Sequence, residues 1–276
     1  MYKNYKSLNQ EFANNFNKKK IEKNKIYKIT KQIINNFINK KKKFIVLKNL
    51  KVDDAYQEKI KVFARTFGVL VSQNLEKAKI IKVTPSDQVT KNTKNQLKKN
   101  RYHQTNIGGS IHTDGPQLNV PPKYLLMGCF NNAKYGGDSV VVNAEKIYRR
   151  IRDLHPDLLE ELKKPVYFEK RGFYKNSKNF YLKKPIFETR DKKIIFRYLR
   201  DYIESAYYKL NINIPKKLRL ALSVLDKNLL NKNFIYNYKL AAGDIIILNN
   251  HLLAHGRKGF KLDNSNKRLI YRIWIK

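Results

Sequence analysis

Short apolar segments separated by turns recur along the chain, and this pattern limits the folds that it can adopt. Runs rich in Ile, Val, Phe and Tyr between turn residues are typical of strands. Many short strands with few long helices favour a barrel or a jelly roll, a mainly β (α+β) fold class. No internal repeat is visible. The expected strands span residues 43–49, 78–83, 123–130, 140–142, 166–169, 180–188, 193–198, 234–240, 245–248 and 268–275.

Helical periodicity is confined to a few stretches. Apolar residues spaced three and four apart begin at Ile26. Asp53 or Asp54 can cap a second helix that ends at Gly68. Residues 1–24 are rich in Lys and Asn and are expected to form a basic N-terminal arm, loose or helical, before a single domain at 25–276. Further helices are expected at residues 144–154 after the cap residue Asn143, at 157–163 after His155-Pro156, and from Pro215 to Leu229.

The charge of the chain is unusual, because 59 basic and 22 acidic residues give a net charge of +37. Such a balance can attract nucleic acid, anionic membranes or acidic substrates. The lysines, however, are scattered over all 276 residues, and no nucleic-acid-binding motif appears. We therefore expect a distributed basic surface, with nucleic acid as the alternative partner.

Targeting signals and disulfides are not expected. No apolar run is long enough to span a membrane, and the first residues lack the apolar stretch of a signal peptide. The single cysteine, Cys129, cannot form an internal disulfide and lies in an apolar run that predicts burial. These features predict a cytoplasmic protein without a membrane span.

His112 and Asp114 form the first candidate for a metal site. Residues two apart on an extended chain point to the same side, so an imidazole and a carboxylate can reach one ion. A mixed nitrogen and oxygen set suits a first-row metal such as iron. The alternative is a polar turn closed by Gly115-Pro116.

A second histidine follows the apolar run 245–248. Two histidines and one carboxylate form the facial triad of non-haem Fe(II) oxygenases, which leaves about three of six octahedral positions open. His255 is the preferred third ligand, because Gly256 would let the backbone turn tightly beside it. His251, four residues earlier, is the rival.

Together, these segments resemble the taurine dioxygenase-like family of Fe(II)/2-oxoglutarate-dependent oxygenases. The resemblance implies a distorted double-stranded β-helix (the clavaminate synthase-like, cupin-like jelly roll) with flanking helices. It also implies Fe(II), 2-oxoglutarate and O2 as cofactor and co-substrates. The matching segments are Gly-Gly-Ser-Ile-His112-Thr-Asp114-Gly-Pro-Gln, Ala133-Lys-Tyr-Gly-Gly-Asp-Ser139, Asn249-Asn-His-Leu-Leu-Ala-His255-Gly-Arg257 and Arg268-x-x-x-Arg272.

Arg268 and Arg272 lie on the last expected strand and share a face with Ile270 and Trp274. Arginines on so apolar a strand need anionic partners, either an Asp or Glu or a bound dicarboxylate, unless the strand is an edge strand that exposes them to solvent. The resemblance implies that Arg268 binds the distal carboxylate of 2-oxoglutarate, and that Arg272 lies near the metal-bound carboxylate. It also implies a hydrogen bond from Ser139 to the co-substrate; without the family, that segment is a hairpin turn.

The candidates for a substrate pocket are less specific. We expect the polar segment 86–106 to be a lid over the site. His103 is expected in that loop, and His155 as a helix terminator. The substrate candidates are Gln73, Asn106, Arg171 and Arg257, with loop support as the alternative for Arg257 and a solvated charge beside Lys170 as the alternative for Arg171.

The predicted function is hydroxylation of a small molecule, with oxidative decarboxylation of 2-oxoglutarate to succinate and CO2. Related halogenases have a small residue at the position of Asp114, so the carboxylate favours hydroxylation or another oxidation such as desaturation. Two alternatives use the basic surface. One is a non-catalytic binding protein that keeps the fold, and the other is an oxygenase that acts on nucleic acid or protein.

Overall fold

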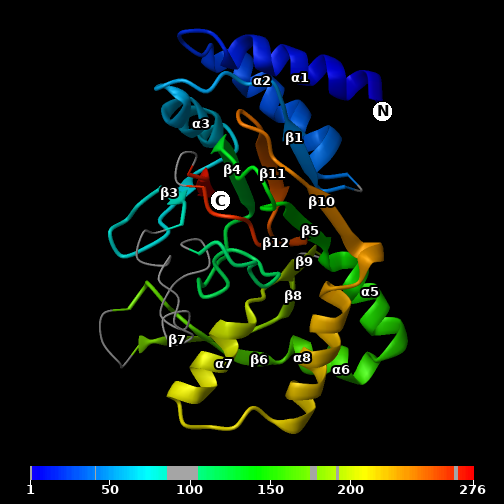
Figure 1. Cartoon of the computed structure of the whole chain (residues 1–276). Coiled ribbons are helices and arrows are strands. Elements are labelled where there is room, and N and C mark those ends of the chain that lie inside the picture. Colours follow the sequence, from blue (N-terminus) through cyan, green and yellow to red (C-terminus); the bar gives the residue numbers. More distant parts are fainter. Residues whose placement is uncertain (1, 41, 86–104, 175–178, 191–192, 264–266) are drawn as a thin grey trace.

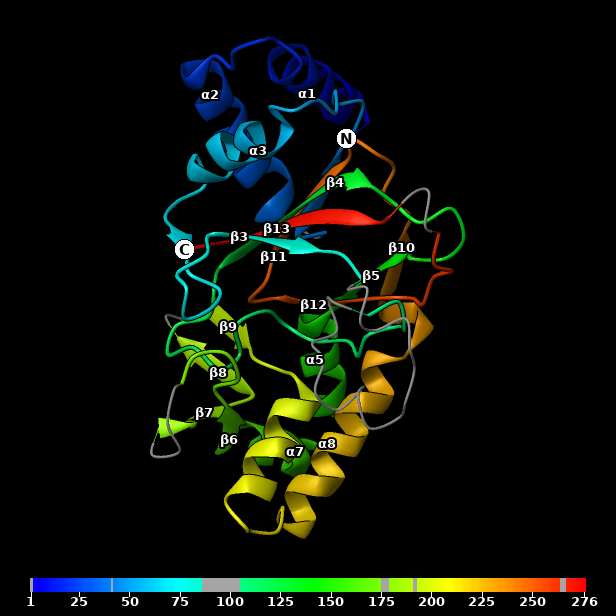
Figure 2. The ribbon, with the colours of Figure 1, turned by 60° about the vertical axis from the view of Figure 1, so that its left-hand side comes forward.

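Two antiparallel sheets face each other at the centre of the structure, and helices cover their outer faces (Figure 1). In the rotated view the layers follow one another as helices, large sheet, small sheet and helices (Figure 2). This structure is a computed structural model, and it describes residues 2–40, 42–85, 105–174, 179–190, 193–263 and 267–276. The sandwich with flanking helices confirms the fold class that the strand pattern predicts.

The large sheet joins segments that are far apart in the sequence. Its strand order is β1-β11-β4-β13-β2, and β3 also pairs with β13. The last strand, β13, therefore lies at the centre of the fold and is paired along its length with β4. The strands are β1 (Phe44–Leu47), β2 (Leu70–Val71), β3 (Ile80–Val83), β4 (Tyr124–Asn131), β11 (Ile245–Asn249) and β13 (Leu269–Ile275).

The small sheet has the order β10-β5-β12, and two short hairpins lie beyond it. β12 follows β11 after a short turn, so the chain passes from one sheet to the other just before His255. The strands of the small sheet are β5 (Ser139–Asn143), β10 (Ile235–Tyr238) and β12 (Leu253–Arg257), and the hairpins pair β6 (Pro165–Glu169) with β7 (Tyr181–Pro185) and β8 (Phe187–Arg190) with β9 (Lys193–Phe196).

Successive side chains of each strand point to opposite faces, so each sheet contributes residues to the core on both of its sides. In β11, Ile246 and Leu248 face the core between the sheets, whereas Ile245 and Ile247 pack against the N-terminal helices. β13 divides in the same way, with Ile270 on the inner side. Arg272 lies on the inner face of β13, and Arg268, one residue before β13, lines the same cavity between the sheets.

The N-terminal segment is a helix that packs on the large sheet. Phe12 and Phe16 are fully buried there, so the loose alternative for residues 1–24 does not hold for 2–16. Burial of two aromatic side chains stabilises this helix. The domain division at residue 24 stays a prediction. The helices on this side are α1 (Tyr2–Phe16), α2 (Lys23–Ile33) with the π-helical turn η1 (Ile34–Ile38), and α3 (Tyr56–Arg65).

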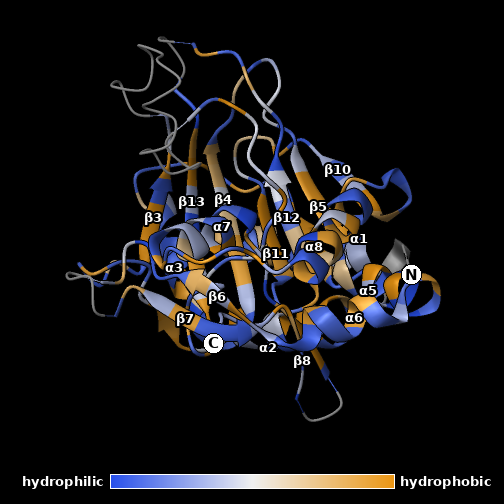
Figure 3. Cartoon of the chain, turned by 90° about the horizontal axis from the view of Figure 1, so that it is seen from below, coloured by the Kyte–Doolittle hydropathy of each residue, from blue (hydrophilic) through white to orange (hydrophobic). Residues whose placement is uncertain are grey.

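A second group of helices covers the small sheet. Seen from below, these helices carry hydrophilic residues outward, while hydrophobic residues line the strands (Figure 3). Asn143 caps the first helix by accepting a hydrogen bond from the Lys146 amide, and Pro215 precedes the last, both as expected. The elements are α5 (Ala144–Leu154), α6 (Pro156–Lys163), α7 (Arg200–Lys209), α8 (Lys216–Leu229) and the 3₁₀ turn η5 (Lys232–Phe234).

Three local expectations were wrong. The N-cap residue of α3 is Ala55, and Asp53 is not the N-cap but forms an ion pair of 2.9 Å with Lys59. The expected strand at 180–188 is divided at Ile186, whose side chain turns into the core. Helix α7 was not expected, because its polar, aromatic sequence has no clear apolar stripe. None of the helices in the described ranges is long and apolar enough to cross a membrane.

Candidate metal and co-substrate site

Backbone pairing brings the two candidate histidines together. The His112 amide donates to the carbonyl of His255 at 2.9 Å, and the His255 amide donates to the carbonyl of His112 at 2.7 Å. The segment before Asp114 thus lies along β12, whose other edge pairs with β5. Residues 143 positions apart in the sequence become neighbours across one ladder, and their rings lie 4.5 Å apart between centroids.

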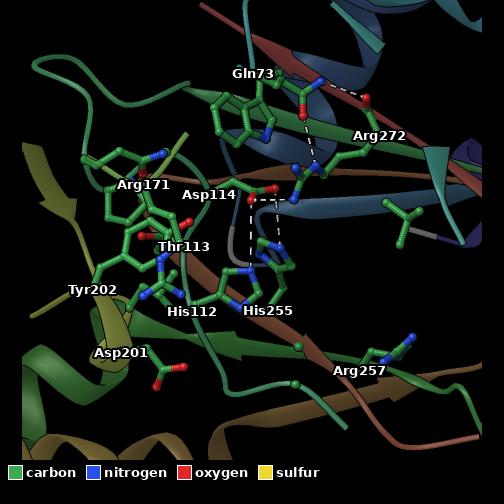
Figure 4. Close-up of a pocket in the computed structure, with 18 of the residues that line it drawn as sticks. Gln73, His112, Thr113, Asp114, Arg171, Asp201, Tyr202, His255, Arg257 and Arg272 are labelled. Carbon is green, nitrogen blue, oxygen red and sulfur yellow. Dashed lines mark hydrogen bonds and ion pairs between the residues drawn. The ribbon is translucent and has the colours of Figure 1, made fainter. Parts of the chain in front are cut away.

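Asp114 completes the cluster from the turn after His112. Ligand atoms of His112, Asp114 and His255 all lie within 4.8 Å of one another. The Nε2 atoms of His112 and His255 are 3.9 and 3.6 Å from the Asp114 carboxylate oxygens. Figure 4 shows the two imidazoles facing this carboxylate from below. The structure therefore brings together the three residues that the sequence proposed as ligands.

The rival histidine lies elsewhere. His251 Nε2 contacts the carbonyl of Pro121 at 3.1 Å and is not part of the cluster. The reason for preferring His255 was nevertheless wrong, because Gly256 lies within β12 and not in a turn. A Cβ at Gly256 would lie 3.4–3.5 Å from Ile111 and from the carbonyls of Gly109 and Ser110. Its small size lets the segment before His112 pass close.

The protonation states suit metal binding, which needs neutral imidazoles and an ionised carboxylate. Burial, followed by the neighbouring His112, lowers the pKa of His255 to about 3, so its ring is neutral. Burial alone would raise the pKa of Asp114, but Arg272 and the two histidines outweigh it and lower that pKa. His112 Nδ1 lies 2.8 Å from the Ser110 carbonyl, a contact that leaves Nε2 as the free ring nitrogen.

Two buried atoms of the cluster lack a hydrogen-bond partner among the described residues: Oδ2 of Asp114 and Nδ1 of His255. Leaving a buried acceptor unpaired costs about 1–3 kcal/mol, and more for a charged group. A cation beside Asp114 would remove this cost. Two imidazoles and one carboxylate form the donor set of non-haem Fe(II) sites, so the residues fit iron.

An amide side chain fixes the backbone of Asp114. Asn250 is fully buried, accepts a hydrogen bond from the Asp114 amide at 2.9 Å, and donates to the Asp114 and Pro122 carbonyls at 2.9 Å. Arg197 holds the same turn from another side, by donating to the carbonyls of Pro116 and Leu118. Sequence reasoning missed both residues, because a buried Asn or Arg has no signature before its partners are known.

Arg272 is bound to the cluster itself. Its Nη1 lies 3.0 Å from Oδ1 of Asp114, and its Nε donates to Gln73 Oε1 at 2.9 Å (Figure 4). Gln73 also donates to the carbonyl of Arg272 at 2.9 Å. An acidic residue was one of the expected partners for Arg272, and in the structure that residue is Asp114. Gln73, a substrate candidate, lines the cavity and holds Arg272.

Arg268 has an unsatisfied donor. Its side chain is 5% exposed, and its Nε donates to Asn132 at 3.1 Å. Nη1 is buried without a partner in the described part of the chain. Burial lowers the pKa of Arg268 to about 10, so the guanidinium stays charged at neutral pH. Ser139, the first residue of β5, lines the same cavity. This end of the cavity therefore presents a cation for which the described residues supply no carboxylate at hydrogen-bond distance.

The cluster opens into one cavity of about 590 Å³. Its metal-side wall is formed by the His112 segment, β12 and β13, and its far wall by the turn after β6 and by α7. Residues of the far wall include Arg171, Leu199, Asp201, Tyr202, Glu204, Ser205 and Tyr208. A cavity of this size with a few polar groups is typical of a small-molecule site.

The other candidates divide between the cavity and its rim. Arg171 lines the cavity. Arg257 also borders it, but its guanidinium donates to the carbonyls of Thr105 and Ile107, as in the loop-support alternative. Asn106 does not line the cavity and donates to the carbonyl of Phe260 at 3.3 Å. Residues 86–104 of the expected lid, with His103, lie outside the described residues, and His155 ends α5 as expected.

A sandwich of antiparallel sheets with two histidines and a carboxylate at the mouth of a cavity defines the class of non-haem iron oxygenases. The chain belongs to the family described as taurine catabolism dioxygenase TauD, TfdA family, whose model matches residues 9–274. This membership confirms the resemblance found in the sequence motifs.

Comparison with characterised proteins agrees. The chain is 24% identical over 213 residues to FR-33289 synthase of Streptomyces rubellomurinus, and 25% identical over 154 residues to gamma-butyrobetaine dioxygenase of Homo sapiens. These alignments cover 75% and 55% of this chain, but 60% and 40% of the relatives. The chain thus spans less than two thirds of the length of these curated relatives.

Two solved structures share the fold. Asparagine oxygenase, in complex with Fe(II), 2S,3S-3-hydroxyasparagine and succinate, superposes with a TM-score of 0.67 at 12% identity, over 98% of this chain and 90% of that one. The non-heme iron oxygenase OrfP, in complex with Fe and alpha-ketoglutaric acid, gives a TM-score of 0.64 at 12% identity, over 99% and 91% of the two chains.

Proposed function

We propose that this protein is an Fe(II)/2-oxoglutarate-dependent dioxygenase that hydroxylates a small molecule. His112, Asp114 and His255 would hold the iron. When bound, Fe(II) activates dioxygen and couples the oxidative decarboxylation of 2-oxoglutarate to oxidation of the substrate. Family membership supports the cofactor and the co-substrate.

One observation carries the proposal: the same cavity holds a buried anion and a buried cation that are both incompletely paired. Oδ2 of Asp114 and Nη1 of Arg268 have no hydrogen-bond partner within the described ranges. A metal ion would neutralise the carboxylate of Asp114, and a carboxylate would neutralise the guanidinium of Arg268. 2-Oxoglutarate is a dicarboxylate that can bind a metal at one end and an arginine at the other.

The side chains around the site would each have a separate task. Arg268 would bind the distal carboxylate of the co-substrate, with Asn132 holding its Nε. Ser139 would add a neutral hydrogen bond. Arg272 would fix the Asp114 carboxylate through Oδ1 and so leave Oδ2 for the metal. The apolar residues Leu199 and Ile270 of the wall would exclude water.

The relatives support a small-molecule substrate. Two similar structures are complexes with succinate and a hydroxylated amino acid, 2S,3S-3-hydroxyasparagine in one and (3S)-hydroxy-L-Arg in the other. By analogy, we infer hydroxylation of a small polar molecule in the cavity. A cytoplasmic location stays a prediction, as does the absence of a dedicated nucleic-acid partner.

The test is formation of succinate from 2-oxoglutarate by purified protein with Fe(II) and O2. We expect slow turnover without a primary substrate, and its loss on removal of iron. Asp114→Ala should abolish turnover, whereas Asp157→Ala, on the exposed start of α6, should not. Equal succinate formation by wild type and Asp114→Ala would reject the proposal.

A further inference from the structure

A buried carboxylate lies behind the far wall of the cavity. Glu169, the last residue of β6, is only 1% exposed and accepts hydrogen bonds from four side chains. Its Oε2 accepts from Arg171 at 3.0 Å and Ser205 at 2.6 Å. Its Oε1 accepts from Tyr174 at 3.0 Å and Lys209 at 2.6 Å. A carboxylate this well paired fixes the groups around it.

Arg171 is anchored by one edge of its guanidinium. Both Nε and Nη2 donate to the same oxygen of Glu169, at 3.2 and 3.0 Å. The ring of Tyr202 supports the flat face, 5.2 Å from the guanidinium carbon. Because the guanidinium is planar, the end that carries Nη1 points away from Glu169. Nη2 also donates to Ser205 Oγ at 3.4 Å, so Nη1 is the nitrogen of this guanidinium that is placed to bind an anionic group.

Glu169 and Arg171 differ in their exposure to solvent. The Glu169 side chain is 2% exposed, whereas that of Arg171 is 31% exposed and lines the cavity. Figure 4 shows Arg171 beside Tyr202, on the other side of the triad from Arg257. An arginine present only to neutralise Glu169 would not need to reach the cavity. Moreover, Lys209 is bound to the same carboxylate, so two positive charges face one negative charge.

We propose that Arg171, positioned by Glu169, binds an anionic group of the primary substrate, a carboxylate or a phosphonate, on the cavity wall opposite Arg268. This inference rests on the proposed function, because it assigns the substrate of that same site. Arg171 is a binding residue, and Glu169 is a positioning residue that acts through it.

The fluorescence of Trp274 can report binding at this subsite. Trp274 is the single tryptophan, lines the cavity, and stacks on Phe173 with ring centroids 6.5 Å apart at an interplanar angle of 14°. Phe173 is two residues from Arg171. Occupation of the Arg171 subsite is therefore expected to change the fluorescence of Trp274.

The test uses two five-carbon probes, pentanoate and pentylphosphonate, which are compared with their uncharged partners pentanamide and diethyl pentylphosphonate. Binding to the full-length protein is measured through Trp274 fluorescence, and substrate-dependent succinate formation through turnover. At least one acid should bind about ten- to a hundred-fold tighter than its neutral partner, the size expected for a charge-assisted pair. The carboxylate and phosphonate probes distinguish the two anion types.

Matched variants assign the preference to Arg171. Arg171→Gln should remove the preference for acid over neutral partner, and Arg171→Lys should keep part of it because the charge remains. Glu169→Gln should weaken it about ten-fold through misplacement of Arg171. Arg152→Gln, on the exposed side of α5, is the control and should keep the wild-type preference.

Two results would overturn the inference: no acid in the panel binding more tightly than its neutral partner, or an unchanged preference in Arg171→Gln. Failure of the proposed function looks different. In that case the wild type would form no iron-dependent succinate, while the preference for acids in the fluorescence titration would persist and would still depend on Arg171.

Discussion

Arg272 Nη1 lies 3.0 Å from Oδ1 of Asp114, so a residue of the last strand holds the carboxylate of the candidate metal site. The two side chains are 15% and 5% exposed, respectively. Arg272 is itself held by Gln73, and the indole of Trp274 lies next to it at 5.2 Å. The ion pair occupies Oδ1 and leaves Oδ2, which lies 3.6 Å from His255 Nε2. We infer that it orients Asp114 before any metal binds.

Loss of this ion pair should destabilise the metal-free protein. Arg272→Leu leaves Asp114 buried without its main counter-charge, which typically costs about 3–5 kcal/mol. Urea unfolding of the metal-free variant measures this loss. Adding Asp114→Asn should recover part of the stability, because the charge that needs a partner is gone. Equal stability of Arg272→Leu and wild type would show that the pair is not formed in solution.

Arg268 should control the requirement for 2-oxoglutarate far more than Ser139 does. Arg268→Ala removes the buried cation of a charge-assisted pair, a loss of about 3–5 kcal/mol or roughly a hundred- to several-thousand-fold in binding. Ser139→Ala removes a neutral hydrogen bond worth about 0.5–1.5 kcal/mol. Succinate formation against 2-oxoglutarate concentration compares the two. If Arg268→Ala leaves that curve unchanged, another residue anchors the co-substrate.

The Glu169 cluster should make stability depend on pH in the acid range. Burial raises the pKa of Glu169, but hydrogen bonds from Lys209, Ser205 and Arg171 outweigh it and lower the pKa from 4.5 to about 2. A lowered carboxyl pKa stabilises the fold above pH 4.5, by up to about 3 kcal/mol here, and this contribution is lost as the pH falls from 4.5 towards 2. Urea unfolding at several pH values should show a smaller acid-range slope for Glu169→Gln than for wild type. Parallel slopes would argue against the cluster.

Sequence patterns predicted the fold and the three candidate ligands because both follow from local rules. Alternation along the last strand placed Arg268 and Arg272 on one face, and the structure agrees. His112 and Asp114 could be proposed from their spacing, whereas the choice of His255 over His251 rested on a turn at Gly256 that the structure does not have. Asn250, Arg197 and Glu169 could not, because their roles arise from partners far away in the sequence. For Arg272, an ion pair with an acidic residue was one of the expected alternatives, but the sequence does not show that this residue is Asp114.

The basic surface should bind DNA only weakly. Lysines are the main source of the net charge of +37 and are spread along the sequence. When binding to DNA depends on charge alone, the affinity falls steeply as the salt concentration rises. Fluorescence anisotropy with a labelled duplex, measured over a series of salt concentrations, tests this expectation. Sequence-specific, nanomolar binding at physiological salt would instead favour a nucleic-acid partner.

The central claim is that His112, Asp114 and His255 hold one iron, and anaerobic equilibrium dialysis with Fe(II) tests it most directly. His251 offers a matched control, because it is a second histidine four residues away that contacts Pro121 instead of the cluster. Wild type and His251→Ala should each retain about one iron per chain, and His255→Ala should retain almost none. Retention of iron by His255→Ala, or its loss from His251→Ala in folded protein, would contradict the assignment.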